Sequence, residues 1–224
     1  MPYLYLVRHG QPDFAGNYDS ITDLGARQST WLGEHFAARG LRFARVLAGT
    51  LQRQVSTCEL VMNALDGPRG FTQDARFNEY DHLSLLGFFE GDRLQAIRAS
   101  GDRREYFAAI RSAMQKWSRH DDLVAGGETW AEFGARIGAG VTAACEGLGR
   151  DDNVLIVTSG GVIGRYTSEV LDAGADAAIQ LNLQIRNTGV TEVIRPASGN
   201  ARLVSFNAIP HLERSDRMHA VTHS

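Results

Sequence analysis

The sequence predicts an α/β fold, a three-layer α/β/α sandwich around a mostly parallel sheet. Apolar, strand-like runs alternate with segments of helical spacing over residues 3–65, and the same order recurs over residues 153–170. Such alternation is typical of a parallel sheet with helices on both faces. Two strand-like runs also end in glycine-flanked polar loops, at residues 8–10 and 159–161. Because open parallel sheets carry ligand sites at the carboxyl ends of their strands, we expect a functional site there.

The bulk properties fit one globular domain. A chain of 224 residues with 43% hydrophobic and 22% charged residues can bury a sizeable core, so we expect a single domain over residues 1–224. The formal net charge is -3, so no overall positive field attracts nucleic acid or an anionic membrane, and neither is an expected partner. An anionic substrate would instead need a local cluster of arginines.

Cysteine usage and the N-terminal run predict a cytoplasmic protein. Cys58 and Cys145 show no metal-like pair spacing and fall in helical patterns, which favours small buried side chains and fits a reducing compartment. The apolar run at residues 3–7 is too short for the core of a signal peptide. No stretch approaches the ~18 apolar residues of a membrane helix.

The first part of the chain predicts two strands, each followed by a helix. Residues 3–7 are apolar, aromatic and branched, which predicts a buried strand. Residues 22–39 predict a helix whose first threonine supplies the N-cap. Residues 44–48 predict a second strand, and the helix predicted over residues 51–65 stops at Gly67-Pro68.

Residues 81–127 interrupt this alternation. Apolar and aromatic residues recur there at helical spacing, which predicts a mainly helical insert over the active site at the carboxyl edge of the sheet. Long inserts at such a place often act as substrate lids. The aromatic residues of this insert include Phe88, Phe89, Tyr106 and Trp117. They either face a bulky substrate group or form a core of the insert, and we favour the core.

The last part of the chain predicts three strands and two more helices, one of which follows Ser159-Gly160-Gly161 and carries Val162, Ile163, Tyr166 and Val170. Residues 129–148 predict a helix, and residues 153–158 are the clearest strand of the sequence. Residues 189–194 and 202–206 predict a closing pair of strands around a Ser-Gly-Asn turn. The segment 215–224 is mostly polar and is expected to be loose.

Three polar loops are expected to meet at the carboxyl edge of the sheet. Arg8 and His9 follow the first strand, Arg53 follows the second, and Ser159 and Gly160 follow the clearest one. Two guanidinium groups suit bidentate contact with phosphate oxygens. A glycine at a helix start lets backbone N–H groups approach an anion. The sequence therefore predicts a phosphate-binding site.

His9 lies among these groups. Neutral imidazole is nucleophilic near neutral pH and can accept a phosphoryl group, while arginines neutralise its oxygens. This setting favours a phosphotransfer nucleophile over a core histidine. No set of His, Asp and Glu residues shows a metal-ligand spacing, and residues 160–164 lack the ending of a P-loop. We therefore expect neither a metal nor another cofactor.

Arg8-His9-Gly10 after an apolar strand resembles the defining motif of the histidine phosphatase (phosphoglycerate mutase-like) superfamily. Further matches follow in the family's order, from residue 3 to about residue 212. They are Thr22, Gly25 and Gln28; Arg53 with Gln54 and Thr57; Glu79 after Arg76 and Phe77; Gly127-Glu128-Thr129 with Arg136; Asn187 before Val190; and Asn207 with His211-Leu212.

The resemblance implies a histidine acid phosphatase-type enzyme that hydrolyses phosphomonoesters without a metal. His9 would form the phosphohistidine and Glu79 would protonate the leaving alcohol, with Asp81 as the nearest competitor for that role. The implied catalytic residues are His9, Glu79, Arg8 and Arg53, and the implied phosphate-binding residues are Arg8, Gln11, Arg53, Ser159 and Gly160. A small phosphorylated substrate is the expected partner. A homodimer is possible, and the sequence leaves the oligomeric state open.

One position departs from the family pattern. The family's second histidine ordinarily precedes the paired glycines after the core strand, and Ser159 stands there. Serine donates a hydrogen bond but carries no charge, so weaker phosphate stabilisation is expected. His82 could compensate, although a structural or specificity role is favoured for it. The alternative function is therefore a weakened family member that binds a phosphorylated ligand or partner as a sensor or scaffold.

A phosphoglycerate mutase is a further alternative within the family. The segment Pro12-Asp13-Phe14 after the nucleophile motif differs from the Ser-x-Trp-Asn sequence typical of the mutase branch. This difference favours a phosphatase.

Overall fold

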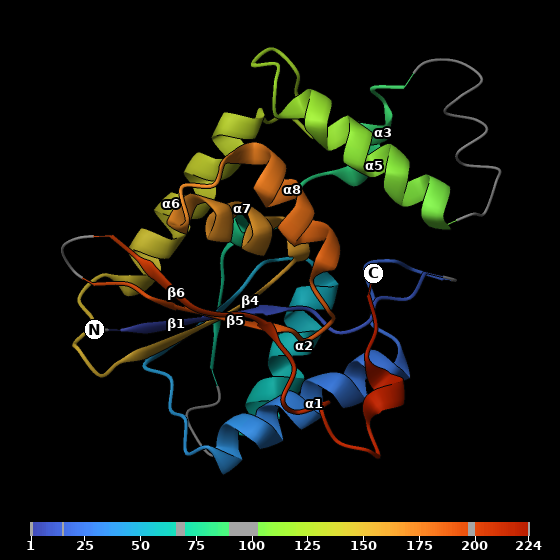
Figure 1. The fold of residues 1–224 in the computed structure, drawn as a ribbon. Coiled ribbons are helices and arrows are strands. Elements are labelled where there is room, and N and C mark those ends of the chain that lie inside the picture. Colours follow the sequence, from blue (N-terminus) through green and yellow to red (C-terminus); the bar gives the residue numbers. More distant parts are fainter. Residues whose placement is uncertain (1, 15, 66–69, 90–102, 197–199, 224) are drawn as a thin grey trace.

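A computed structural model describes residues 2–14, 16–65, 70–89, 103–196 and 200–223 (Figure 1). The predicted helix stop at Gly67-Pro68 lies outside these residues, and so does most of the predicted turn at residues 198–200. Within the described part, no helix is long and apolar enough to cross a membrane.

A six-stranded sheet forms the middle layer, with the strand order β3-β2-β4-β1-β5-β6. The strands are β1 (Tyr3–Arg8), β2 (Arg45–Ala48), β3 (Thr72–Gln73), β4 (Asn153–Thr158), β5 (Val190–Ile194) and β6 (Arg202–Ala208). β1 pairs in parallel with β4 and antiparallel with β5, and β5 pairs antiparallel with β6. Only β5 runs against its neighbours, which confirms the predicted mostly parallel sheet.

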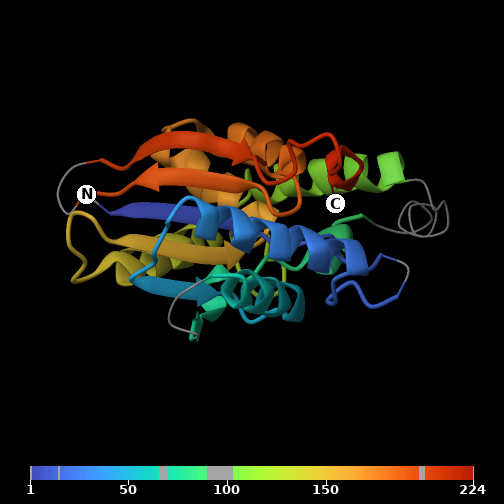
Figure 2. The ribbon, with the colours of Figure 1, turned by 90° about the horizontal axis from the view of Figure 1, so that it is seen from below.

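Helices cover both faces of the sheet, as Figures 1 and 2 show. The helices are α1 (Asp23–Ala38), α2 (Gln52–Asn63), α3 (His82–Leu86), α5 (Arg103–Trp117), α6 (Trp130–Cys145), α7 (Gly160–Val170) and α8 (Gly174–Gln184), with short 3-10 turns η1 (Ala75–Phe77) and η2 (Met218–Ala220). α1 and α2 cover one face, and α6 and α7 cover the other. The three-layer sandwich is confirmed.

Apolar residues of the central strand β1 pack against the helical layers on both faces of the sheet. Leu4 and Leu6 face the core that contains Phe133 and Ile163, whereas Tyr5 and Val7 face the core that contains Phe36. This alternation follows from the two-residue period of a strand, and it explains why β1 is apolar along its length.

The insert is helical in its described part. α3 and α5 lie toward the end of the molecule where β1 and β4 finish, and α5 packs against α8 (Figures 1 and 2). Phe89 and Trp117 are buried in the same large core as the sheet, and Phe88 and Tyr106 pack against it. The packing supports a core role for these aromatic residues, but they join the main core of the sheet and do not form a small core of the insert alone.

Among the described α-helices and strands, α8 and β3 were not predicted. α8 was not predicted because only Ala178, Ile179 and Asn182 of its 11 residues are buried. Three buried residues are too few to give an amphipathic pattern. β3 consists of two exposed residues and carries no apolar signal.

The prediction of a loose segment at residues 215–224 is wrong for its described part. η2 places Ala220 in a fully buried position beside Leu212, and Arg217 lies over the Trp31 ring at 4.5 Å. A backbone bridge joins Arg186 to His223. The contacts of Ala220, Arg217 and His223 hold the segment in place, and the polar composition of the segment does not predict such contacts.

Candidate active site

His9 stands where the two central strands end side by side. Arg8 pairs with Thr158 in the parallel register, so the next residues, His9 and Ser159, leave the sheet together. The His9 backbone N–H continues the ladder and donates to the Thr158 carbonyl oxygen at 2.9 Å. The side chain is only 1% exposed.

The imidazole of His9 is oriented by its own loop. Its Nδ1 lies 2.8 Å from the Gly10 carbonyl oxygen. A carbonyl oxygen only accepts, so Nδ1 carries the proton and Nε2 keeps its lone pair. Burial, with Arg53 and Arg8 nearby, holds the pKa of His9 well below its usual range. The ring is therefore neutral near pH 7, the form that can attack an electrophile.

Side chains from α2 and the loop before β5 fix the backbone around His9. Gly10 N–H donates to Thr57 Oγ1 at 2.9 Å, and Asn187 Nδ2 donates to the His9 carbonyl oxygen at 3.2 Å. A Cβ at Gly10 would lie 2.5 Å from the Gly25 carbonyl oxygen, so a larger residue would push this loop away from α1.

Gln11 serves the loop itself in this structure. Its side-chain Oε1 accepts from Thr22 Oγ1 at 2.9 Å, and its backbone N–H donates to Gln28 Oε1 at 2.9 Å. Thr22 also caps α1 by accepting from the Gly25 N–H at 3.0 Å. The start of α1 is thus tied to the residues that follow the nucleophile.

Arg8 and Arg53 are both buried, at 5% exposed each. The Arg8 guanidinium donates to the Ile185 carbonyl oxygen. A Cβ at Gly160 would lie 3.6 Å from Arg8 Cζ, so this arginine lies at the start of α7. Arg53 Nε is buried and has no hydrogen-bond partner within the described ranges. It is therefore a donor available to a bound anion.

Glu79 reaches the site from the segment between η1 and α3. Its Oε2 accepts from the Gly161 N–H at 2.9 Å, at the first turn of α7. Burial raises the pKa of Glu79, although the Gly161 N–H and the two arginines act against that rise. The carboxyl group therefore holds its proton to a higher pH than an exposed glutamate does, as a general acid requires.

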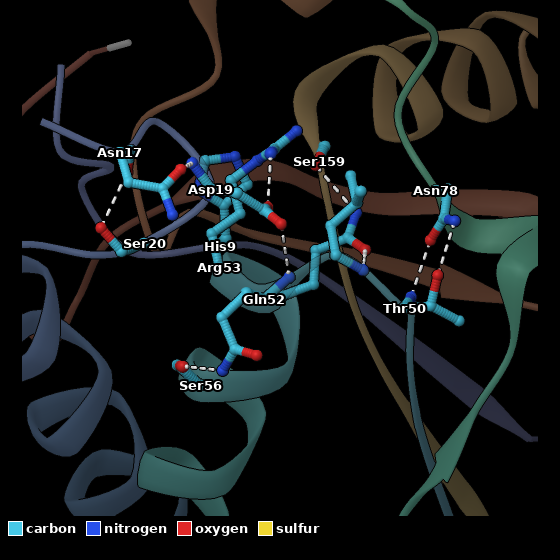
Figure 3. A network of polar contacts seen from close by, with 12 residues as sticks. His9, Asn17, Asp19, Ser20, Thr50, Gln52, Arg53, Ser56, Asn78 and Ser159 are labelled. Atoms are coloured by element: carbon cyan, nitrogen blue, oxygen red, sulfur yellow. Dashed lines mark hydrogen bonds and ion pairs between the residues drawn. The ribbon is translucent and has the colours of Figure 1, made fainter.

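Ser159 is fully buried and begins α7 without capping it. Its Oγ accepts from Gln54 Nε2 at 2.9 Å, and the same amide nitrogen donates to the Phe77 carbonyl oxygen at 3.1 Å. Figure 3 draws this hydrogen bond at the labelled Ser159. Since the oxygen is already an acceptor, the hydroxyl hydrogen is free to point elsewhere.

Comparison with known proteins agrees with the motif order. The family model described as the histidine phosphatase superfamily (branch 1) matches residues 4–209. The chain belongs to this superfamily. The match spans strands β1 to β6 and contains every residue of the site described above.

Curated relatives within the superfamily include phosphoglycerate mutases. A 2,3-bisphosphoglycerate-dependent phosphoglycerate mutase of Rhizobium meliloti (strain 1021) is 31% identical over 143 residues, which are 60% of this chain and 62% of the relative. The corresponding protein of Mesorhizobium japonicum is 29% identical, over 60% of this chain and 64% of its own. The chain thus matches less than two thirds of the length of these two relatives. A probable phosphoglycerate mutase GpmB of Erwinia tasmaniensis is 26% identical, over 86% of this chain and 85% of the relative.

Solved structures of the superfamily share the fold. YhfR of Bacillus stearothermophilus superposes with a TM-score of 0.71 at 22% identity, covering 95% of this chain and 100% of that one. A mycobacterial glucosyl-3-phosphoglycerate phosphatase in complex with VO3 gives a TM-score of 0.66 at 21% identity, over 93% and 100% of the two chains.

Arg136 and Glu128 hold the segment that precedes Glu79. Arg136 forms a two-pronged ion pair with Glu128, with N–O distances of 2.7 Å. Its Nη1 also donates to the carbonyl oxygens of Arg76 and Asn78 at 2.8 Å each. The competing acid, Asp81, instead accepts from two backbone N–H groups at the start of α3. Of the two acids, Glu79 is therefore the one in contact with α7.

The contacts that cover Arg53 were not predicted from the sequence. Asp19 Oδ1 lies 2.8 Å from Arg53 Nη1, a pair drawn beside His9 in Figure 3. The Tyr18 ring lies under the Arg53 guanidinium at 4.9 Å and meets the His82 ring at 5.3 Å. Burial and Arg53 lower the pKa of His82, so it does not supply the positive charge that Ser159 lacks. Tyr18 and Asp19 lie in an irregular loop, where no periodic pattern marks them.

Proposed function

We propose that the chain is a metal-independent phosphomonoester hydrolase that works through a phosphohistidine on His9. The observation that carries this proposal is the fixed orientation of a neutral imidazole, with Nδ1 held by the Gly10 carbonyl oxygen and Nε2 left to react. Both neighbouring arginines are buried close enough to lower the pKa of this ring. A phosphoryl group is the electrophile that such a charge pattern suits.

The reaction would proceed in two steps. The Nε2 lone pair of His9 attacks phosphorus, the bond to the leaving oxygen breaks, and Glu79 gives that oxygen its proton. Water then attacks the phosphohistidine and gives a proton to the Glu79 carboxylate. The N–P bond breaks, which releases phosphate and restores neutral His9 and protonated Glu79. Arg8 and Arg53 neutralise the phosphoryl oxygens in both steps.

Phosphate binding would also involve the start of α7. The first N–H groups of a helix lack partners within it and attract anions. Gly160 stands there, and its lack of a side chain leaves room for Asn182, whose Oδ1 would lie 2.5 Å from a Cβ, while Arg8 Cζ would lie 3.6 Å away. We assign the hydroxyl hydrogen of Ser159 to a phosphoryl oxygen, since Gln54 already occupies the oxygen as donor. Gln11 would contribute to the phosphate site through its loop.

A small phosphorylated molecule is the proposed substrate, with residues 81–127 acting as the lid of a single domain in the cytoplasm. Relatives are named as phosphoglycerate mutases, and fold neighbours include phosphatases such as a phosphoserine phosphatase of Entamoeba histolytica. We favour hydrolysis because Pro12-Asp13-Phe14 replaces the segment typical of the mutase branch. If the protein moved the phosphate group from one position of phosphoglycerate to another and released no inorganic phosphate, that result would support a mutase function.

Turnover of an aryl phosphate by the protein and by His9→Ala tests the proposal. We expect release of phosphate by the unchanged protein and a loss of at least about 10³-fold in the variant, because the nucleophile is gone. Equal rates in the two proteins would refute the role of His9.

The second candidate is a phosphate-binding sensor or scaffold, and Ser159 is the observation that favours it. Ser159→His separates the two candidates. If serine is a handicap that weakens catalysis, the variant gains activity. We expect a loss, because Ser159 is 0% exposed and Gln54 Nε2 occupies the space beside it. Binding of inorganic phosphate without any turnover would support the sensor.

A further inference from the structure

The segment 217–223 is linked to the nucleophile loop, residues 9–11, through Gln28 and Asn187, and the Thr222 hydroxyl bonds to both of these side chains. Thr222 Oγ1 accepts from Gln28 Nε2 at 2.8 Å and donates to Asn187 Oδ1 at 2.9 Å. The Asn187 N–H also donates to the Thr222 carbonyl oxygen at 3.0 Å. One threonine thus joins α1 to the loop before β5.

Both amides continue to the backbone around His9. Gln28 Oε1 accepts from the Gln11 N–H at 2.9 Å, on the far side of the loop. Asn187 Nδ2 donates to the His9 carbonyl oxygen at 3.2 Å. The two amide side chains are 0% exposed. Because they are buried, a lost partner is not simply replaced by bulk water.

The Thr222 hydroxyl bridges two amides whose orientations are set by backbone groups. Gln28 Nε2 donates to Thr222 and to the Ala220 carbonyl oxygen, at 2.8 and 2.7 Å, so Oε1 is left to face the Gln11 N–H. If the Gln28 amide were reversed, its NH2 group would face the Gln11 backbone N–H, and two donors would lie against each other. At Asn187, the His9 carbonyl oxygen accepts from Nδ2, so Oδ1 faces Thr222 and accepts its hydroxyl hydrogen. Threonine serves here because it accepts and donates at once.

We propose that Thr222 is a positioning residue for His9. It does not touch the substrate and acts through Gln28 and Asn187, which hold the backbone on either side of the nucleophile. The inference rests on the proposed function, since it assigns a role in that reaction. Small displacements of a reacting group cost large factors in rate, so a distant hydroxyl can affect kcat without affecting substrate affinity.

The test compares Thr222→Val, which keeps the shape and removes the hydroxyl, with Thr222→Ser, which keeps the hydroxyl. Thr142→Val, an exposed threonine on α6, is the matched control. We expect T222V to lower kcat for an aryl phosphate about 10-fold, a loss of the size that misplacement of a reacting group produces, with KM within about twofold. T222S should recover most of kcat, and T142V should match the unchanged protein.

Amide hydrogen exchange at residues 10–11 gives a second readout that needs no turnover. We expect faster exchange in T222V than in T222S or T142V. Unchanged kcat together with unchanged exchange in folded T222V would overturn the inference, and so would a T222S variant as impaired as T222V. If T222V does not fold, the same comparison is made with Thr222→Ala. If the unchanged protein shows no turnover, the proposed function fails, and exchange alone decides the positioning role.

Discussion

The nucleophile loop and the rim of the site are held in different ways. Residues 9–11 are bonded through their backbone to four separate elements, and the groups that hold them are mostly buried. The rim, which we define as Tyr18 and Asp19, contacts Arg53 through a single ion pair and a ring face. The Asp19 side chain is 41% exposed, in contrast to 7% for that of Arg53.

This difference separates the parts that carry chemistry from those that control access. A buried, multiply bonded loop keeps the orientation of His9, and preorganised groups of this kind supply much of the rate of an enzyme. Asp19 is the exposed partner of this ion pair, so salt and a competing anion weaken the pair and Asp19 can leave Arg53 when a phosphate arrives. We therefore expect changes near the loop to alter kcat and changes at the rim to alter binding.

Glu79→Gln is expected to have the largest effect. The variant cannot give a proton to a leaving alcohol, so kcat for an alkyl phosphate should fall about 10²- to 10⁴-fold. Hydrolysis of p-nitrophenyl phosphate should fall less, because that leaving group departs without a proton. The ratio of the two rates is the measurement, and equal losses would contradict the acid role.

The pH profile sharpens the same assignment. Glu79 must be protonated for the first step, so the rate of that step falls as pH rises through the Glu79 pKa. Burial raises this pKa and therefore moves the alkaline limb of the profile to higher pH. His9 must be neutral, so the rate falls as pH drops through the His9 pKa, which lies well below its usual range. E79Q should abolish the alkaline limb of kcat/KM for an alkyl phosphate and keep the acid limb. A persistent alkaline limb would point to another group.

Much of the nucleophile side could be predicted from the sequence, whereas the rim could not. His9 and Ser159 follow the two clearest strands, and parallel pairing brings the ends of such strands together. Glu79 was placed by the family order. Tyr18 and Asp19 depend on the path of an irregular loop, which carries no periodic signal. The hydroxyl of Thr222 bonds to the side chains of Gln28 and Asn187, which lie 194 and 35 positions away in the chain, so no local pattern marks these contacts.

Asp19→Asn is expected to strengthen anion binding by about twofold to fivefold, the range for the loss of one partly exposed charge pair. The carboxylate competes with phosphate for Arg53, and its removal also lowers repulsion. Inhibition by vanadate measures the effect. Asp23→Asn changes the net charge equally at an exposed site on α1 and should leave inhibition unchanged. Weaker inhibition in D19N would mean that Asp19 aligns Arg53.

Tyr18→Ala should have the smallest effect. Tyr18 contacts Phe14 at 5.0 Å between ring centres, and Phe14 is 49% exposed, so this part of the rim offers an aromatic surface. Loss of the ring should raise KM for an aryl phosphate about threefold, in line with the energy of one aromatic pair, and leave KM for glycerol phosphate nearly unchanged. Tyr18→Phe should behave as the unchanged protein. An equal rise for both substrates would exclude a role in leaving-group selection.

The most direct measurement is to trap the phosphorylated protein during turnover by rapid quenching. We predict a phosphate that is stable in alkali, labile in acid, located on the peptide that contains His9, and absent from His9→Ala. Turnover without such a species, or phosphate found on another residue, would contradict the central claim that His9 is the nucleophile.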